Sequence, residues 1–359
     1  MLVLNERGLY CPSGDFHIDP RGAVEHAVIT HAHSDHARRG SKRYYTAAPG
    51  VDLLRARLGK DLPVRGFAYG ERFRFNGVEV SLHPAGHILG SAQVRVRSGA
   101  EVWVASGDYK REPDPTCEPF EVVACDVFVT EATFGTPAFA WPAGADPGRE
   151  IFDWWDGNAR KGVNSVLFAY SLGKAQRVLG VLAPWAKKPV HCHEAVTAIN
   201  ECYRAQGVKL APTRCLSEVG PRERLRGELI LVPPSFLQTE RAKLVGSSFE
   251  TAFASGWTAR GPRPGARWSR GHDRGFVMSD HADFEALVRT ARETGAKCVY
   301  VQHRGNGALV RRLKALGLRA YPESALAPKA PGRGSRPPGP GSGPPGPGAG
   351  PPGQLALFS

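Results

Sequence analysis

The chain has 359 residues, of which 42% are hydrophobic and 23% charged, so it can bury one large core or a core and a second module. Its 47 lysines and arginines outnumber its 34 acidic residues and leave a formal net charge of +13. No apolar run approaches the roughly 18 residues of a membrane span, and the seven scattered cysteines, with no C-x-x-C pair, argue against a disulfide framework or a thiolate zinc site.

These properties predict a cytoplasmic protein without a membrane partner. The positive charge favours a polyanion such as nucleic acid, because clustered Lys and Arg side chains attract phosphate groups. The alternative is that much of the surplus is solvated surface arginine.

Short β-branched runs alternate with turn signals from about residue 3 to residue 135. The predicted strands are 27–30, 78–83, 92–96, 101–106 and 126–132. Strands with few helices between them predict a sheet-on-sheet half of an α/β protein.

Strands and helices alternate from about residue 140 to residue 235, which predicts a smaller α/β module. Its predicted strands are 165–170 and 228–232, and its predicted helices are 174–185 and 195–207. Residues 257–275 are expected to form a basic loop broken by Gly and Pro.

The last globular segment is predicted to contain a helix capped by Asp283, a strand over 297–303, a helix over 308–317 and a short strand over 319–322. From residue 326 the composition changes to Pro, Gly and Ser. Such a segment cannot build a core, so we expect a disordered tail.

The most specific motif is T-H-A-H-S-D-H, which directly follows the first predicted strand. It places His31, His33, Asp35 and His36 on one loop, where imidazoles suit zinc and similar ions and a carboxylate favours a second metal. A lone histidine is more often structural. Here three further candidates, His87, Asp108 and His303, lie at or just beyond the ends of other predicted strands, so the pattern favours a metal centre.

The order H-x-H-x-D-H, then His, then Asp resembles the metallo-β-lactamase superfamily. The later motifs TEATFG, YSLGKAQRVL and GFVMSDHADF resemble its β-CASP branch and, within that branch, the bacterial ligase-associated DNA exonucleases. The resemblance covers about residues 5–325. It implies an α/β fold, an αββα sandwich formed by residues 1–139 and 273–325, with an inserted β-CASP domain at 140–272 and the tail at 326–359.

The resemblance also implies the roles of the site residues. His31, His33 and His87 would hold one divalent ion, and Asp35, His36 and His303 a second, with Asp108 bridging them; zinc or manganese is expected. Asp19 would brace the histidine loop. Asp35, Asp108, Glu131 and His281 would be the catalytic set, with His281 as general acid oriented by Glu131, since a histidine can donate a proton near neutral pH. Arg304 follows His303 where relatives have glycine, so the wall of the second site is expected to differ.

Several basic, aromatic and turn residues are candidates for binding the substrate, although a solvated loop is the alternative for the arginine-rich stretch. They are Lys110, Ser171, Lys174, Trp257, Arg260, Arg263, Arg267, Arg270 and Arg274.

The end of the tail, QLALFS, differs from the Pro/Gly composition around it. Gln354, Leu355, Leu357 and Phe358 resemble the peptide with which bacterial repair proteins bind the sliding clamp. A short apolar motif on a flexible tether suits such capture; the alternative is an incidental apolar stub.

Together these features predict a two-metal phosphodiesterase, a DNA exonuclease of repair acting on single-stranded or end-containing DNA. A DNA ligase is an expected partner, and the expected location is the cytoplasm, at the nucleoid. The alternatives are an RNA-processing nuclease of the same fold, a hydrolase of small esters or thioesters, and a scaffold without activity.

Overall fold

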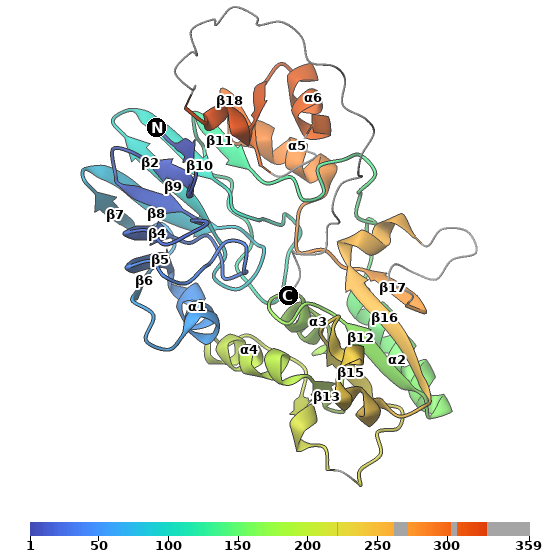
Figure 1. Ribbon diagram of the computed structural model, residues 1–359. Coiled ribbons are helices and arrows are strands. Elements are labelled where there is room, and N and C mark those ends of the chain that lie inside the picture. The colour runs from blue at the N-terminus through green and yellow to red at the C-terminus, as the bar shows by residue number, and fades with distance from the viewer. Residues whose placement is uncertain (221, 262–271, 303–306, 329–359) are drawn as a thin grey trace, which may run out of the picture.

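The computed structural model describes residues 1–220, 222–261, 272–302 and 307–328 as a mixed α/β fold with three sheets (Figure 1). The mixed α/β class predicted from the sequence is confirmed. Among these residues, no helix is both long and apolar enough to cross a membrane.

Two sheets pack against each other. The first, in the order β1-β2-β3-β4-β5-β6, and the second, in the order β19-β18-β11-β10-β9-β8-β7, share one apolar core that includes Phe16 and Phe67 from the first and Val80 and Val94 from the second. The strands of the first sheet are Val3–Asn5 (β1), Gly8–Cys11 (β2), Phe16–Ile18 (β3), His26–Val28 (β4), Arg43–Ala47 (β5) and Val64–Phe67 (β6). Those of the second are Arg72–Phe75 (β7), Val78–Pro84 (β8), Ala92–Ser98 (β9), Glu101–Ala105 (β10), Val127–Thr130 (β11), Cys298–Val301 (β18) and Arg319–Pro322 (β19).

Helices cover the outer faces of these two sheets. Helix α1 (Val51–Leu58) packs over the first sheet, and α4 (Glu194–Ala205) joins the same apolar cluster. Helices α5 (Phe284–Glu293) and α6 (Gly307–Ala315) pack over the second sheet. Asp283 caps α5 as predicted, since its carboxylate accepts a hydrogen bond from the backbone N–H of Ala286 (2.9 Å).

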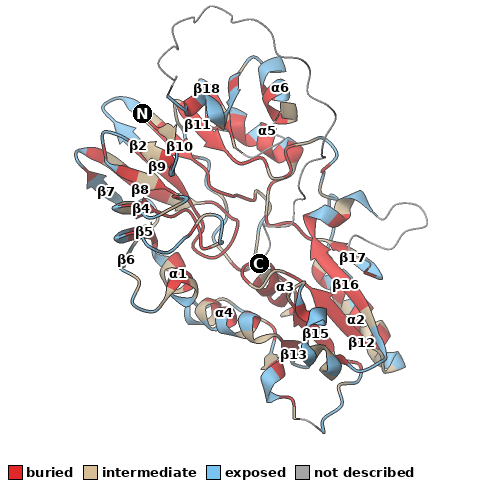
Figure 2. Ribbon diagram, viewed as in Figure 1, coloured by how far each residue is buried: buried red, intermediate tan, exposed pale blue. Residues whose placement is uncertain are grey.

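The third sheet is wholly parallel, in the order β14-β13-β15-β12-β16-β17. Every residue of β12 and β15 is buried (Figure 2), as expected for central strands of a parallel sheet covered on both faces. Helix α3 packs on one face, as does α2. The bounds are Pro147–Lys161 (α2), Asn164–Phe168 (β12), Lys174–Leu182 (α3), Val190–Cys192 (β13), Thr213–Cys215 (β14), Leu229–Val232 (β15), Phe249–Ser255 (β16) and Arg274–Val277 (β17). Short 3₁₀ turns are Ala48–Gly50 (η1), Leu216–Glu218 (η2), Phe236–Gln238 (η3), Glu240–Val245 (η4), Gly256–Arg260 (η5) and Glu323–Leu326 (η7).

The expectation of a loop over residues 257–275 is wrong at both ends. Residues Gly256–Arg260 form η5, and Arg274 begins β17, which pairs with β16. The third sheet therefore extends past the boundary expected at residue 272.

The topology explains where functional side chains can gather. Strands β10, β11 and β18 are parallel neighbours, so their carboxyl ends lie at the same edge of the second sheet. The loop after β4 reaches this edge, because the backbone N–H of Ala92 at the start of β9 bonds to the carbonyl of Thr30 (2.8 Å).

Candidate metal centre

The histidine loop after β4 is held by Asp19. This residue adopts a left-handed backbone conformation (φ 46°), and its carboxylate accepts hydrogen bonds from the backbone N–H and the hydroxyl of Thr30 (2.8 and 2.5 Å). The same carboxylate accepts from Nδ1 of His36 at 2.7 Å. Burial alone would lower the pKa of His36, but the charges of Asp108 and Asp19 raise it well above the ordinary value. The ring is therefore a cation in this structure, and a metal at Nε2 would have to displace the proton there. The predicted bracing position of Asp19 agrees with this geometry.

Two further histidines are oriented by backbone carbonyls. Nε2 of His33 donates to the carbonyl of Leu172 (3.1 Å), and Nδ1 of His87 donates to the carbonyl of Asp280 (2.8 Å). A carbonyl can only accept, so the opposite nitrogens, Nδ1 of His33 and Nε2 of His87, carry lone pairs. These two lone pairs face each other at 3.1 Å, an arrangement that a cation would stabilise.

His31 and Asp108 complete a four-residue cluster. Within the part of the chain that the structure describes, Nε2 of His31 and Oδ1 of Asp108 are buried without a hydrogen-bond partner. Ligand atoms of His31, His33, His87 and Asp108 all lie within 4.8 Å of one another. Buried polar atoms without partners are costly unless something satisfies them, and a metal ion would do so.

Burial lowers the pKa of His31, His33 and His87 below the ordinary histidine value. Neutral imidazoles are the form that binds a metal. Three neutral imidazoles with one carboxylate form a donor set that fits zinc or a similar divalent ion.

Asp108 lies between this cluster and the neighbouring residues. Its Oδ2 is 3.6 Å from Nε2 of His31 and 3.5 Å from Nε2 of His36. Burial alone would raise the pKa of Asp108, but His36 and His281 hold it well below its usual range, so the group is a carboxylate. An anionic Asp108 in this position suits a bridging ligand.

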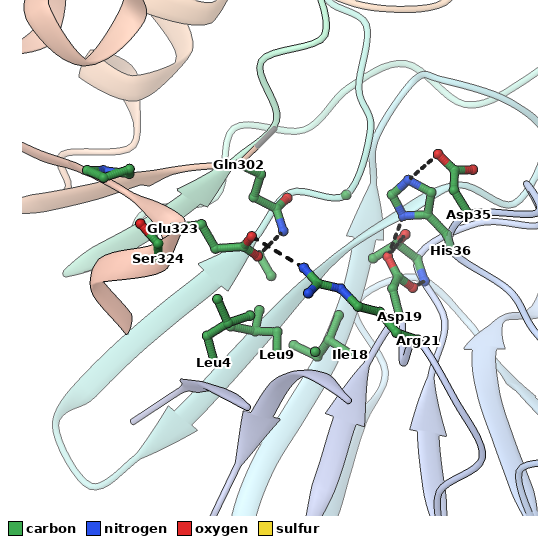
Figure 3. Close-up of a pocket in the computed structure, with 15 residues that line it drawn as sticks. Leu4, Leu9, Ile18, Asp19, Arg21, Asp35, His36, Gln302, Glu323 and Ser324 are labelled. Atoms are coloured by element: carbon green, nitrogen blue, oxygen red, sulfur yellow. Dashed lines mark hydrogen bonds and ion pairs between the residues drawn. The ribbon is translucent and has the colours of Figure 1, made fainter. Parts of the chain in front are cut away.

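The second expected metal position is only partly described. Asp35, His36 and Asp108 come together, with Oδ2 of Asp35 3.6 Å from Nε2 of His36 and the Asp35 side chain 50% exposed. His303 lies outside the described residues. A cavity of about 550 Å³ opens beside Asp35 and His36 and is bounded on its far side by Gln302 and Glu323 (Figure 3).

Glu131 and His281 form a second chemical group beside the cluster. Nδ1 of His281 is 3.0 Å from Oε2 of the buried Glu131, whose Oε1 accepts from the backbone N–H of Tyr109 (2.6 Å). Nδ1 of His281 is also 3.9 Å from Oδ2 of Asp108. Burial alone would lower the pKa of His281, but the charges of Glu131 and Asp108 raise it to about 9. The imidazole is therefore protonated at neutral pH and can donate a proton.

A buried ion cluster supports this region from the third sheet's side. The carboxylate of Asp280 pairs with Nζ of Lys174 (2.9 Å) and Nη1 of Arg177 (3.4 Å), and Nε of Arg177 also pairs with Asp114 (3.1 Å). All four side chains are at most 12% exposed. Arg177 in addition donates to the carbonyl of Ser279. Helix α3 thus holds the segment that carries His281.

The lysines predicted to bind substrate lie inside the protein. Lys174 donates to the carbonyl of Met278 as well as pairing with Asp280, and burial lowers its pKa to about 8. Lys110 donates to the carbonyls of Glu112 and Pro113, and its pKa is also lowered by burial to about 8. Their ammonium groups are used by internal partners, so direct phosphate contacts by Lys110 and Lys174 are not supported.

The other residues predicted to bind the substrate or the clamp lie partly within and partly outside the described residues. Ser171 is half-buried in the turn before α3, Arg274 lies on β17 over the ring of Phe276, and Trp257 and Arg260 lie on η5. The candidates outside the described residues are Arg263, Arg267, Arg270, Gln354, Leu355, Leu357 and Phe358.

Sequence reasoning did not identify three groups that orient the cluster. The carbonyls of Leu172 and Asp280 are backbone atoms, for which residue type gives no signal. Arg177 could have been noticed, because it lies one helical turn after Lys174, on the same face of the predicted helix.

No family model matches the chain. The chain is similar to a protein named "Probable DNA ligase" from Opitutus terrae, with 28% identity over 88% of this chain and 30% of that protein. It is also similar to "RNase aCSPSF2" from Saccharolobus solfataricus (28% identity, 45% of this chain, 39% of the relative) and to the "RNase J-like protein" of Methanocaldococcus jannaschii (23%, 50% and 48%).

The chain spans less than half the length of each of these relatives. Their number and kind confirm the resemblance to the β-CASP metallo-β-lactamase nucleases, with a protein named for a DNA ligase among them. Such relatives imply divalent metals, and the His31, His33, His87 and Asp108 cluster can bind one.

Proposed function

We propose that this chain, a relative of the β-CASP nucleases, is a two-metal phosphodiesterase that acts as a DNA exonuclease in repair. One observation carries the proposal: His281, whose Nδ1 is 3.0 Å from Oε2 of Glu131, lies beside a cluster of four side chains that could hold a metal. A phosphodiesterase needs the metals and also gains from an acid for its leaving oxygen.

The proposed fold is a metallo-β-lactamase αββα sandwich made by the first two sheets and their outer helices. The third sheet would be the inserted β-CASP domain. The packing of the first two sheets and the return of the chain to β18 and β19 support this assignment.

Bound divalent ions, zinc or manganese, would supply an activated water and a clamp for the phosphate oxygens. His31, His33 and His87 present lone pairs that their hydrogen bonds have already oriented, and Asp108 presents its carboxylate between the two positions. His281 gives its proton to the leaving oxygen. Glu131 stabilises the imidazolium before that transfer and holds the ring in place.

DNA is the proposed substrate because the relative aligned over 88% of the chain is named for a DNA ligase, and the net charge of +13 suits a polyanion. A ligase acting on the same ends is the proposed partner, in the bacterial cytoplasm at the nucleoid. Clamp binding through Gln354, Leu355, Leu357 and Phe358 stays a prediction. RNA processing is the second candidate, because other relatives are named RNases.

The test uses end-labelled single strands of DNA and RNA with one sequence, incubated with the full chain and Mn²⁺ or Zn²⁺. Stepwise loss of the DNA label, absent in His33→Ala, is the expected result. Preference for RNA would transfer the proposal to the second candidate. If wild type cuts neither strand with either metal, the nuclease proposal is wrong.

A further inference from the structure

We propose that Trp257, supported by the rings of Phe134 and Phe139 and flanked by Arg260, is a stacking site for an unpaired base. The base belongs to the nucleotide that carries the leaving oxygen. This inference rests on the proposed function, since it places the site relative to the bond that is cut.

A continuous row of rings links Trp257 to His281. The ring of Phe134 is 5.8 Å from that of His281 and 4.8 Å from that of Trp257, between centroids. Phe139 contacts both Phe134 (4.8 Å) and Trp257 (5.2 Å). Trp257 is therefore two ring contacts away from the candidate general acid, within reach of a nucleotide whose phosphate lies at the cluster.

The row is held in place by specific contacts. Nε1 of Trp141, whose ring is 4.9 Å from that of Phe134, donates to the backbone carbonyl of His281 (3.0 Å). The backbone N–H of Trp257 bonds to Oγ of Ser255. A Cβ on Gly256 would lie 2.7 Å from the ring of Phe134, so only glycine lets η5 approach this closely. The aromatic row and the segment of the general acid thus form one rigid unit.

Trp257 differs from its supporting rings in exposure. Phe134 and Phe139 are 3% and 5% exposed, whereas Trp257 is 43% exposed. A single exposed aromatic residue is common on protein surfaces. Here the exposed indole of Trp257 packs on the buried rings of Phe134 and Phe139, and the Phe134 ring also contacts His281. The guanidinium of Arg260 lies 5.1 Å over the ring of Phe139. An aromatic face with a guanidinium beside it matches a base and its phosphate.

The proposed occupant follows from this geometry. Stacking on Trp257 requires a free base face, which bases inside a duplex do not offer, so the site favours a single strand or an unpaired end. His281 donates to the leaving oxygen, and the row of rings extends from His281. The stacked base is therefore on the leaving-group side of the scissile phosphate. Stacking reads no sequence, which suits an enzyme that removes successive nucleotides.

The experiment combines abasic substrates with variants of Trp257. Single strands carry one abasic nucleotide on either side of the scissile phosphate, and kcat/KM is measured for the full chain with Mn²⁺. Binding is measured separately by fluorescence anisotropy with the metal chelated. Trp257→Phe keeps an aromatic face, and Phe249→Ala is the control, since Phe249 is 38% exposed and lies about 20 Å along β16 from Ser255.

Trp257→Ala should weaken binding of the intact strand by about 5- to 150-fold, and Trp257→Phe and Phe249→Ala should bind nearly as wild type. In wild type, an abasic nucleotide on the leaving-group side should lower kcat/KM far more than one on the other side. Trp257→Ala should lose this difference. The wild-type comparison of the two abasic strands does not depend on whether Trp257→Ala folds.

Equal responses of wild type to the two abasic positions, or equal binding by Trp257→Ala and Phe249→Ala, would overturn the stacking site while leaving the nuclease proposal standing. Conversely, Trp257-dependent binding of intact strands by a wild-type protein that cuts no strand would refute the nuclease proposal and the leaving-group placement, while supporting base stacking on Trp257.

Discussion

Asp280→Asn tests the buried ion cluster that joins the third sheet to the segment of His281. The Asp280 carboxylate lies 2.9 Å from Nζ of Lys174 and 3.4 Å from Nη1 of Arg177, and its side chain is 7% exposed. The neutral amide keeps the shape but leaves two buried cations without this partner. Breaking a buried ion pair from one side costs about 3–5 kcal/mol.

The structure favours the lower end of that range, about 3 kcal/mol in the free energy of unfolding. Burial has already lowered the pKa of Lys174 to about 8, so Lys174 can release its proton once Asp280 is neutral. Arg177 cannot, but it retains Asp114 at 3.1 Å and the carbonyl of Ser279. Asp280→Asn therefore leaves only Arg177 as a permanent cation without its Asp280 partner, and Arg177 still pairs with the carboxylate of Asp114.

The same reasoning fixes the pH dependence. In the variant, the folded-state pKa of Lys174 falls further below its unfolded value, so the unfolded chain binds more protons and stability rises with pH. Wild type keeps Lys174 charged up to about pH 8. The loss caused by Asp280→Asn should therefore be larger at pH 6 than at pH 9.

Urea unfolding of the full chain at both pH values measures this loss. Asp52→Asn is the matched control, because Asp52 pairs with Arg55 on an exposed helix turn and should change stability by less than about 0.5 kcal/mol. The double variant with Lys174→Met should recover part of the loss. Metal affinity should also fall, by at most about 10- to 100-fold, because the Asp280 side chain holds the backbone segment whose carbonyl orients His87. A loss below about 1 kcal/mol, independent of pH, would refute the reasoning.

Two further predictions concern proton transfer and the turn before α3. Glu131→Gln removes the main charge that raises the pKa of His281 to about 9. The alkaline limb of the kcat profile should therefore move toward the ordinary histidine value of 6.5. A limb that stays near pH 9 in the variant would exclude Glu131 as the cause of the raised pKa. Gly173→Ala places a Cβ 2.3 Å from Cγ2 of Ile88 at φ +87°, whereas Gly207→Ala meets open space at φ +78°. Both substitutions strain the backbone, but only Gly173→Ala should lose about 1–3 kcal/mol more in the free energy of unfolding, because of the clash. Only Gly173→Ala should also weaken metal binding. Equal unfolding midpoints and metal affinities of the two variants would contradict this prediction.

Much of the fold was accessible from short-range patterns. The strands over 78–83, 92–96 and 101–106 and the cap at Asp283 are confirmed because alternation and capping are local properties. Helix α2 was not predicted, although its signals are present: Asp146 caps it, Pro147 opens it and Gly162 ends it in a left-handed conformation. Strands β1 and β3 have three residues each, too few to establish a period.

In the candidate site, too, the residue types could be predicted from the sequence, whereas their long-range contacts could not. The residues of the H-x-H-x-D-H loop, His87 and Asp108 could be selected by type and by their position after strands. The direction in which a long side chain points could not be predicted from the sequence. Lys174 begins α3, as the pattern indicated, but its ammonium reaches back to Asp280, more than a hundred residues away in the chain. No local rule encodes that partner.

The orientation of the His33 and His87 rings depends on contacts between the first two sheets and the third sheet. The nitrogen that each histidine presents is decided by its other hydrogen bond, and for His33 and His87 the acceptors are carbonyls of Leu172 and Asp280. Leu172 precedes α3, and Asp280 follows β17, so both carbonyls are positioned by the third sheet. A metal bound by His33 and His87 therefore favours the conformation in which these contacts are made, and by linkage the docked third sheet strengthens metal binding. The third sheet thus helps to form the candidate metal centre, through the carbonyls of Leu172 and Asp280.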